Sequence, residues 1–109
     1  MRSNSEALLA NELFEQGIPF RYEQALYLGD IKVYPDFTIL DPVTLKKTII
    51  WEHFGLMDSQ TYSNNAKLKL GAYLESQYIP GKNLILTYES KAMPLDINYI
   101  QTLISYHFS

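Results

Sequence analysis

Apolar positions follow a helical spacing in three parts of the chain and a strand spacing between them. The first helical pattern covers residues 3–17, where Ser3 and Glu6 have the spacing of a capping box and Gly17 stands where a helix C-terminus is expected. The apolar stripe of this predicted helix is formed by Leu9, Leu13 and Phe14. Glu6 lies at the head of the stripe, which is an unusual place for an acidic residue.

Alternating apolar and polar positions follow this helix. Residues 20–27 and 31–40 predict a hairpin around the turn Gly29-Asp30. The apolar face of its second strand is formed by Ile31, Val33, Phe37 and Ile39. Residues 48–54 (TIIWEHF) predict a dense third strand at the centre of the sheet, covered on both sides.

The second half of the chain predicts a helix, a strand and a final helix. Asp58 or Ser59 caps a helix that runs to about Tyr78, and a buried strand follows at residues 83–88. The inner stripe of this helix is formed by Tyr62, Ala66, Leu70, Tyr73 and Leu74. A strand, a helix and a strand at this spacing favour a parallel, right-handed crossover. The apolar stripe of the last helix is formed by Ile97, Ile100, Leu103, Ile104 and Phe108.

These elements predict an α/β fold with a mixed (α+β) sheet, in the order helix-strand-strand-strand-helix-strand-helix. The 109 residues, 47% of them hydrophobic, are enough for one domain spanning residues 1–109. The absence of cysteine excludes disulfide scaffolds, cysteine zinc sites and thiol nucleophiles, and it fits a reducing compartment, so we expect a cytoplasmic protein. No apolar stretch approaches 18 residues, so we expect no membrane insertion.

The charge balance is mildly acidic, because 9 Lys and Arg stand against 12 Asp and Glu and give a net charge of −3. This balance argues against a protein that holds nucleic acid by bulk charge alone. Asp36 follows Pro35 in the middle of a predicted strand, although both residue types are depleted in strands. Either this strand is an edge strand or bulge that tolerates the pair, or Asp36 has a functional reason to be there.

Glu52 is the second acid in an unexpected place, because it shares a strand face with Ile50 and Phe54. Burial of a carboxylate is costly unless the group is paired, protonated or bound to a cation. A salt bridge to Arg21 or to a lysine is the structural alternative. Together with Asp36 on the adjacent strand, however, Glu52 can share a divalent cation such as Mg²⁺, which prefers oxygen ligands and keeps several waters. Such a site activates water and neutralises the charge that develops on a phosphodiester.

Two short segments carry a resemblance to a known family. YPDF at residues 34–37 and IWEHFG at residues 50–55 resemble the paired motifs of the PD-(D/E)xK nuclease superfamily, and more closely its branch similar to very-short-patch-repair endonucleases. The similarity covers roughly residues 3–90. It implies a restriction-endonuclease-like core, a Mg²⁺ or Mn²⁺ ion, and DNA as the substrate.

The resemblance also assigns roles to individual residues. It implies that Asp36 and Glu52 are metal ligands, that the main-chain carbonyl of His53 is a further ligand, and that Glu6 assists as an acid from the first helix.

One position departs from the family pattern, because Phe54 stands where a lysine is expected. Phenylalanine cannot orient or deprotonate water. Lys69 lies toward the inner face of the second predicted helix, whereas Lys67 points further toward solvent, so Lys69 is a candidate to reach the carboxylates. The alternative for Lys69 is a rim residue whose stem covers apolar surface.

His53 is the other candidate for the missing role. In a regular strand its ring points to the face opposite Glu52, but a bulge ending at Gly55 would swing it round, and an imidazole suits general-base chemistry at neutral pH. The alternative is a core histidine that donates to a main-chain carbonyl.

The sequence therefore predicts a Mg²⁺-dependent endodeoxyribonuclease domain. The alternative is a catalytically inactive domain of the same fold that acts as a binding or dimerisation module, with Phe54 marking the lost chemistry. Because specific DNA interfaces usually bury about 1,000 Å² or more, we expect the chain either to form a homodimer or to be part of a larger protein.

Overall fold

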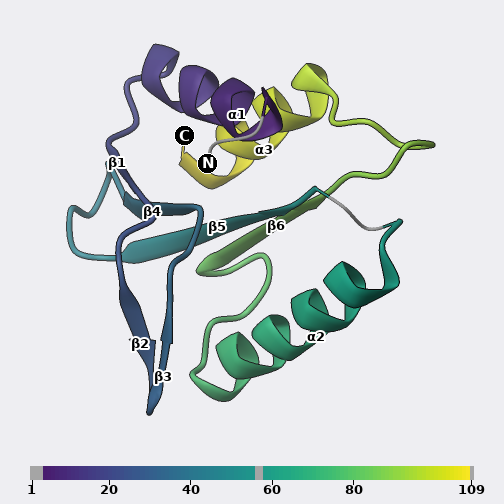
Figure 1. Cartoon of the computed structure of the whole chain (residues 1–109). Coiled ribbons are helices and arrows are strands. Elements are labelled where there is room, and N and C mark those ends of the chain that lie inside the picture. The colour runs from purple at the N-terminus through teal and green to yellow at the C-terminus, as the bar shows by residue number, and fades with distance from the viewer. Residues whose placement is uncertain (1–3, 56–57, 109) are drawn as a thin grey trace.

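A computed structural model describes residues 4–55 and 58–108 of the chain. Its helices are α1 (Asn4–Glu15), α2 (Gln60–Glu75) and α3 (Ile97–Phe108). Its strands are β1 (Phe20–Tyr22), β2 (Leu26–Leu28), β3 (Ile31–Val33), β4 (Phe37–Leu40), β5 (Thr48–Phe54) and β6 (Leu84–Tyr88). Four strands form a mixed sheet in the order β1-β4-β5-β6, with α1 and α3 on one face and α2 on the other (Figure 1). This arrangement confirms the predicted α+β class.

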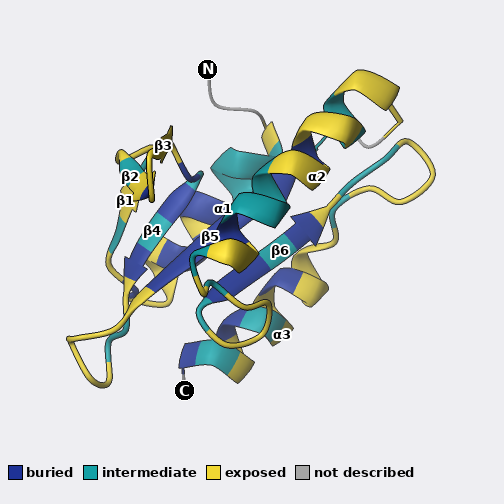
Figure 2. Cartoon of the chain, turned by 90° about the horizontal axis from the view of Figure 1, so that it is seen from below, coloured by how far each residue is buried: buried dark blue, intermediate teal, exposed yellow. Residues whose placement is uncertain are grey.

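Strand β5 is the centre of the sheet, as its apolar run predicts. It pairs antiparallel with β4 and parallel with β6, so that α2 is the crossover between two parallel strands. All its residues after Thr48 are buried, and Figure 2 shows it as the most continuously buried strand. The predicted bounds of this strand, 48–54, agree with the structure.

Alternation along β5 divides the core between the two faces of the sheet. Trp51 faces α1 and α3 and packs with Leu9, Phe37 and Ile100, all of them fully buried. On the other face Ile50 packs with Tyr73 and Leu84. Burial of each large apolar side chain contributes roughly 1.5–3 kcal/mol, which anchors both layers of helices to the same strand.

The predicted hairpin is interrupted in both of its strands. The break after β1 contains Glu23, whose φ of +52° is left-handed, and the break before β4 contains Pro35. As a result β2 and β3 leave the main sheet and form a two-stranded hairpin of their own (Figure 1). The prediction of two unbroken strands over 20–27 and 31–40 is therefore wrong, because a left-handed residue and a proline do not continue a ladder.

The predicted apolar stripes are mostly confirmed, with four exceptions at their edges. Each of these side chains lies at the margin of its stripe and faces solvent: Phe14, Ile31, Leu74 and Ile97. The buried side chains of α1 include Glu12, which the predicted stripe leaves out. Glu12 accepts a hydrogen bond from Gln101 of α3 at 3.3 Å.

Two helix ends follow the predicted signals, whereas α2 ends at Glu75, before the predicted Tyr78, because Gln77 has a left-handed φ of +69°. Ser59 caps α2 by accepting a hydrogen bond from the Tyr62 amide, and Gly17 has the left-handed φ of +71° that ends α1. The proposed cap Ser3 lies outside the described residues. Within the described parts of the chain, none of the helices has the length and apolar character needed to cross a membrane.

Candidate active site

Asp36 and Glu52 meet where β4 and β5 begin to separate. Because Phe37 pairs with Trp51 in an antiparallel ladder, the preceding Asp36 lies opposite Glu52. The Asp36 amide donates to Glu52 Oε1 at 3.1 Å, and the His53 amide donates to Asp36 Oδ2 at 2.7 Å. Each carboxylate thus accepts a hydrogen bond from a main-chain amide of the other segment, which fixes the position of one relative to the other.

The second oxygen of Glu52 is held from helix α2. Lys69 Nζ lies 2.5 Å from Glu52 Oε2, and the Tyr73 hydroxyl donates to the same oxygen at 2.7 Å. Lys69 and Tyr73 are four residues apart and so lie on one face of the helix. Burial raises the pKa of the Tyr73 phenol, and the charge of Glu52 raises it further, so that Tyr73 acts as a donor.

The charges at this site do not balance. Burial, followed by the charge of Glu52, raises the pKa of Asp36 to about 7, although the His53 amide and Lys69 oppose the shift. The charge of Glu6 adds to it. One ammonium group therefore stands beside two carboxylates, and the cost of ionising Asp36 shows that this part of the molecule can accept further positive charge.

A cavity of about 220 Å³ opens beside these groups. It is lined by Asp36, Glu52, His53, Phe54, Tyr62, Asn65, Ala66 and Lys69. The Gly55 amide donates to the Tyr62 hydroxyl at 3.1 Å, so the phenolic proton must point elsewhere. Among residues 4–55 and 58–108 the hydroxyl donates no hydrogen bond, and burial raises the Tyr62 pKa, so Tyr62 is a neutral group that can donate to a cavity ligand.

The side chain of His53 lies on the opposite face of the sheet. Nδ1 is 2.8 Å from the Thr87 hydroxyl, and Nε2 is 2.8 Å from Glu89 Oε1. Thr87 also accepts from Trp51 Nε1 at 3.1 Å, and the Ser5 hydroxyl donates to Glu89. Since β5 and β6 pair residue by residue from Ile50 to Phe54, the bulge that would turn His53 toward Glu52 is not formed. The expectation of an imidazole base at this site is therefore wrong for the geometry seen here.

Glu6 and Phe54 complete the set of residues predicted from the sequence. Glu6 accepts a hydrogen bond from the Tyr22 hydroxyl at 2.8 Å, and it acts on Asp36 through its charge. Phe54 lines the cavity and stacks on Tyr88, with ring centroids 5.5 Å apart. Position 54, where the resemblance implies a lysine, thus holds a packed aromatic ring, and the cation beside Glu52 comes from α2.

The donor set fits a hard divalent cation. Mg²⁺ is commonly held by one or two carboxylates and completes its shell with water and substrate oxygens. Asp36 and Glu52 supply such a pair, and a bound cation would offset the burial and the charge of Glu52 that raise the pKa of Asp36. In the described ranges, no three His, Cys, Asp or Glu side chains are grouped as a closed metal site. The main-chain carbonyl of His53 stays a predicted ligand.

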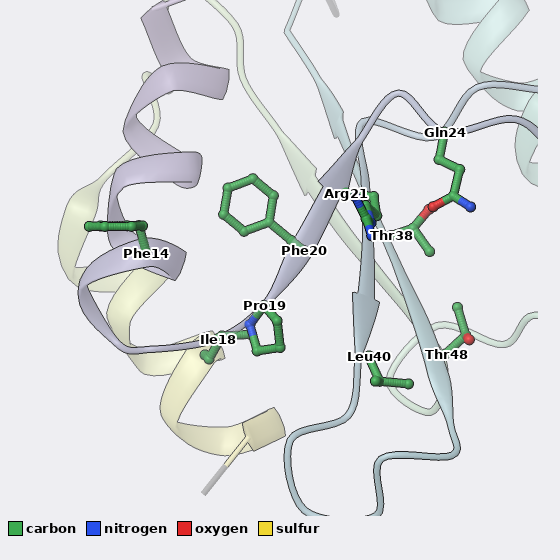
Figure 3. A pocket seen from close by; sticks show the side chains of 9 residues that line it. All are labelled: Phe14, Ile18, Pro19, Phe20, Arg21, Gln24, Thr38, Leu40 and Thr48. Atoms are coloured by element: carbon green, nitrogen blue, oxygen red, sulfur yellow. The ribbon is translucent and has the colours of Figure 1, made fainter.

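A larger cavity lies elsewhere and has different chemistry. It measures about 640 Å³ and is lined by Phe14, Ile18, Pro19, Phe20, Arg21, Gln24, Thr38, Leu40 and Thr48 (Figure 3). No carboxylate belongs to this lining, and Arg21 is its one charged residue. The smaller cavity, which brings two acids and a lysine together, is therefore the candidate active site.

Three residues of these networks were not singled out for chemistry from the sequence. Tyr73 is predicted only as part of an apolar stripe, although its spacing of four from Lys69 could have placed both on Glu52. Thr87 and Glu89 carry no sequence signal, because their partner His53 lies more than thirty residues away in the chain.

Comparison with known proteins leaves the family of the chain open. No protein-family model matches it, and no solved structure matches it. A stretch of 68 residues, 62% of this chain, is 37% identical to the uncharacterized protein MJ1519 of Methanocaldococcus jannaschii. That stretch covers 5% of the archaeal protein, so the chain corresponds to a small part of this relative.

Proposed function

We propose that this chain is a metal-dependent nuclease domain with a restriction-endonuclease-like core of the PD-(D/E)xK type, which hydrolyses DNA phosphodiester bonds. The observation that carries the proposal is the convergence of Asp36, Glu52 and Lys69 on one cavity. Two carboxylates and a lysine are the side chains that the resemblance requires. Here the lysine comes from α2, which supports a working site despite Phe54.

Each residue has a distinct task in the proposed reaction. Asp36 and Glu52 hold Mg²⁺ or Mn²⁺, which when bound supplies an activated water and neutralises charge on the phosphate. Lys69 places its ammonium group beside Glu52, where it stabilises negative charge that develops on the phosphoryl oxygens. Tyr73 keeps Glu52 oriented, and the Tyr62 hydroxyl donates a hydrogen bond to a substrate oxygen in the cavity.

A cleavage assay combined with a metal-binding measurement tests this function. Supercoiled plasmid and a labelled single-stranded oligonucleotide are incubated with Mg²⁺ or Mn²⁺, and Mn²⁺ binding is followed by calorimetry. Asp36→Asn and Glu52→Gln are each expected to abolish Mn²⁺ heat and to reduce cleavage at least 100-fold, because each removes a charged ligand. Glu15→Gln, on the exposed end of α1, is the matched carboxylate control and is expected to behave as the wild type.

The same measurements identify the alternative function. If the wild type shows no Mn²⁺ heat that depends on Asp36 and Glu52, the nuclease proposal fails. Metal binding without cleavage of either substrate would instead favour an inactive nuclease-fold module that binds a partner. The small share of the archaeal relative that the chain matches supports a domain within a longer protein over a free-standing enzyme.

A further inference from the structure

The hairpin formed by β2 and β3 has two contrasting faces. Its inner face carries Leu26, Leu28 and Val33, which pack on the core beneath α2. Its outer face carries Tyr27, Lys32 and Tyr34, because residues alternate between faces and Tyr27 pairs with Lys32 in the ladder. Tyr27 is 67% exposed and Tyr34 is 53% exposed. Two large aromatic rings thus stand in solvent on a hairpin that projects from the main sheet (Figure 1).

A cation lies over both rings. Lys32 Nζ is 5.8 Å from the ring centroid of Tyr27 and 5.4 Å from that of Tyr34. These distances allow cation–π attraction, so the ammonium group is kept at the centre of the outer face. Lysine is depleted from the centre of protein–protein interfaces, whereas a cation between exposed aromatic rings suits a phosphate backbone with unpaired bases.

The outer face lies close along the chain to the candidate active site. Tyr34 precedes Asp36 by two residues, so their Cα atoms are within about 7 Å, the reach of two extended residues. A nucleic acid strand with a phosphate at Asp36 needs to span only this distance to reach Tyr34. Negative charge flanks the hairpin at Glu23 and Asp30, which restricts phosphate contact to the neighbourhood of Lys32.

We propose that the outer face of the β2–β3 hairpin binds single-stranded DNA, with bases stacked on Tyr27 and Tyr34 and a phosphate at Lys32, and that it guides the strand to Asp36. The guiding role rests on the proposed nuclease function, whereas the binding itself does not. An unpaired strand is the occupant because only unstacked bases offer their faces to aromatic rings. A net charge of −3 gives nucleic acid of either form little electrostatic attraction, so stacking on the two rings carries the preference for an unpaired strand.

Fluorescence anisotropy with a labelled 12-nucleotide oligo(dT) tests the proposal in EDTA, where metal-dependent cleavage does not occur. Tyr27→Ala and Tyr34→Ala are each expected to weaken binding at least fivefold, because each removes a stacking platform. Tyr27→Phe and Tyr34→Phe keep the rings and are expected to bind within twofold of the wild type. Lys32→Gln is expected to lower the slope of binding against salt by about 0.7, the effect of one lost contact to a single-strand phosphate.

Tyr106→Ala is the matched control, because Tyr106 is 77% exposed on α3, away from the hairpin. It is expected to bind oligo(dT) as the wild type does. All these side chains are exposed, and circular dichroism verifies that each variant is folded.

Three results would overturn the binding proposal. They are unchanged affinity in the two alanine variants, equal affinity for a duplex of the same length, and self-association of the wild type that the alanine variants abolish. The last would identify the face as a contact between copies of this chain. None of these depends on cleavage, so the hairpin can fail while Asp36 and Glu52 prove catalytic, and oligo(dT) binding can persist if the nuclease function fails.

Discussion

Glu52 and His53 are neighbours in β5 and are both buried, yet their side chains occupy different environments on the two faces of the sheet. Each ring nitrogen of His53 has a protein partner, in Thr87 and Glu89. Glu52 also has partners, but it shares its cavity with Asp36, whose ionisation is opposed by burial and by Glu52 itself. Burial alone therefore does not distinguish the two faces.

The difference lies in charge balance and access. On the α1 face a histidine, a hydroxyl and a carboxylate complete one another's hydrogen bonds, and such a network stabilises the fold. On the α2 face two carboxylates and one ammonium group open to a cavity, and unbalanced charge beside a cavity is typical of functional sites. The following variants separate these two roles.

The largest effect is expected at Lys69. Lys69→Met keeps most of the side-chain length but removes the charge beside Glu52, and it is expected to reduce cleavage by about 10²–10³-fold, the usual loss for one transition-state donor. Mn²⁺ affinity, measured by calorimetry, is expected to stay equal or increase, because a positive neighbour is lost. Lys67→Met, on the exposed side of the same helix, is the control and is expected to retain full activity. Equal losses in both variants would show that Lys69 has no special role.

The second prediction concerns pH, since the two faces respond with opposite sign. The folded pKa of Asp36 is about 7, above its ordinary value of 3.8, so between these values the folded state binds more protons than the unfolded state. Stability without metal is therefore expected to fall as the pH rises from about 4 to about 7, by a few kcal/mol at about 1.4 kcal/mol per pKa unit.

Glu89 makes the stability depend on pH in the opposite direction. Burial raises its pKa, but hydrogen bonds from Ser5 and His53 outweigh that effect and leave the pKa below its ordinary value of 4.5. The stability that the ionised Glu89 contributes is fully present above pH 4.5, and it is lost as the pH falls through the pKa of Glu89 in the folded state. Urea unfolding, followed by the fluorescence of the single Trp51, measures both trends. Asp36→Asn is expected to remove the loss between pH 4 and 7, and a flat wild-type profile there would contradict the raised pKa.

The smallest effect is expected on the α1 face. Thr87→Val keeps the shape of the side chain but leaves Trp51 Nε1 and His53 Nδ1 without their shared partner. The expected loss of stability is about 1–3 kcal/mol, the cost of leaving buried polar groups unsatisfied. Urea unfolding measures this loss, while Mn²⁺ affinity is expected to change less than twofold. Thr102→Val, at an exposed hydroxyl of α3, is the control. A large loss of metal affinity in Thr87→Val would break the distinction between the faces.

The local pattern of apolar residues is sufficient to predict the elements that form the core of the main sheet. The run at 48–54 is apolar enough to define its own bounds, and helical spacing located the α2 face that carries Ala66 and Tyr73. The bounds of the hairpin strands are wrong because the alternation of apolar and polar residues continues through Glu23 and Pro35, whereas the pairing of the strands stops there. A period-two pattern reports the polarity of side chains and does not reveal a residue with a positive φ.

The candidate site was predictable in its acids and less so in its partners. Asp36 and Glu52 stand out because carboxylates in strands conflict with local preference. The contact of Lys69 with Glu52 depends on how α2 packs against β5. Helical spacing shows which face Lys69 lies on, but it does not show what that face packs against. The pairing of His53 with Glu89 likewise follows from the parallel register of β5 and β6.

The place of α2 in the chain also determines at which point of protein synthesis the candidate site can be complete. Asp36 and Glu52 are brought together by the antiparallel pairing of β4 and β5, but Lys69 reaches them only after α2 has turned back over the sheet. During synthesis the two acids leave the ribosome before the lysine, and domains generally fold as units as they emerge. On the proposed function, a nascent chain that stops short of α2 holds both carboxylates and cuts no DNA. If the proposed function holds, the order of the elements thus delays cleavage until the fold is complete.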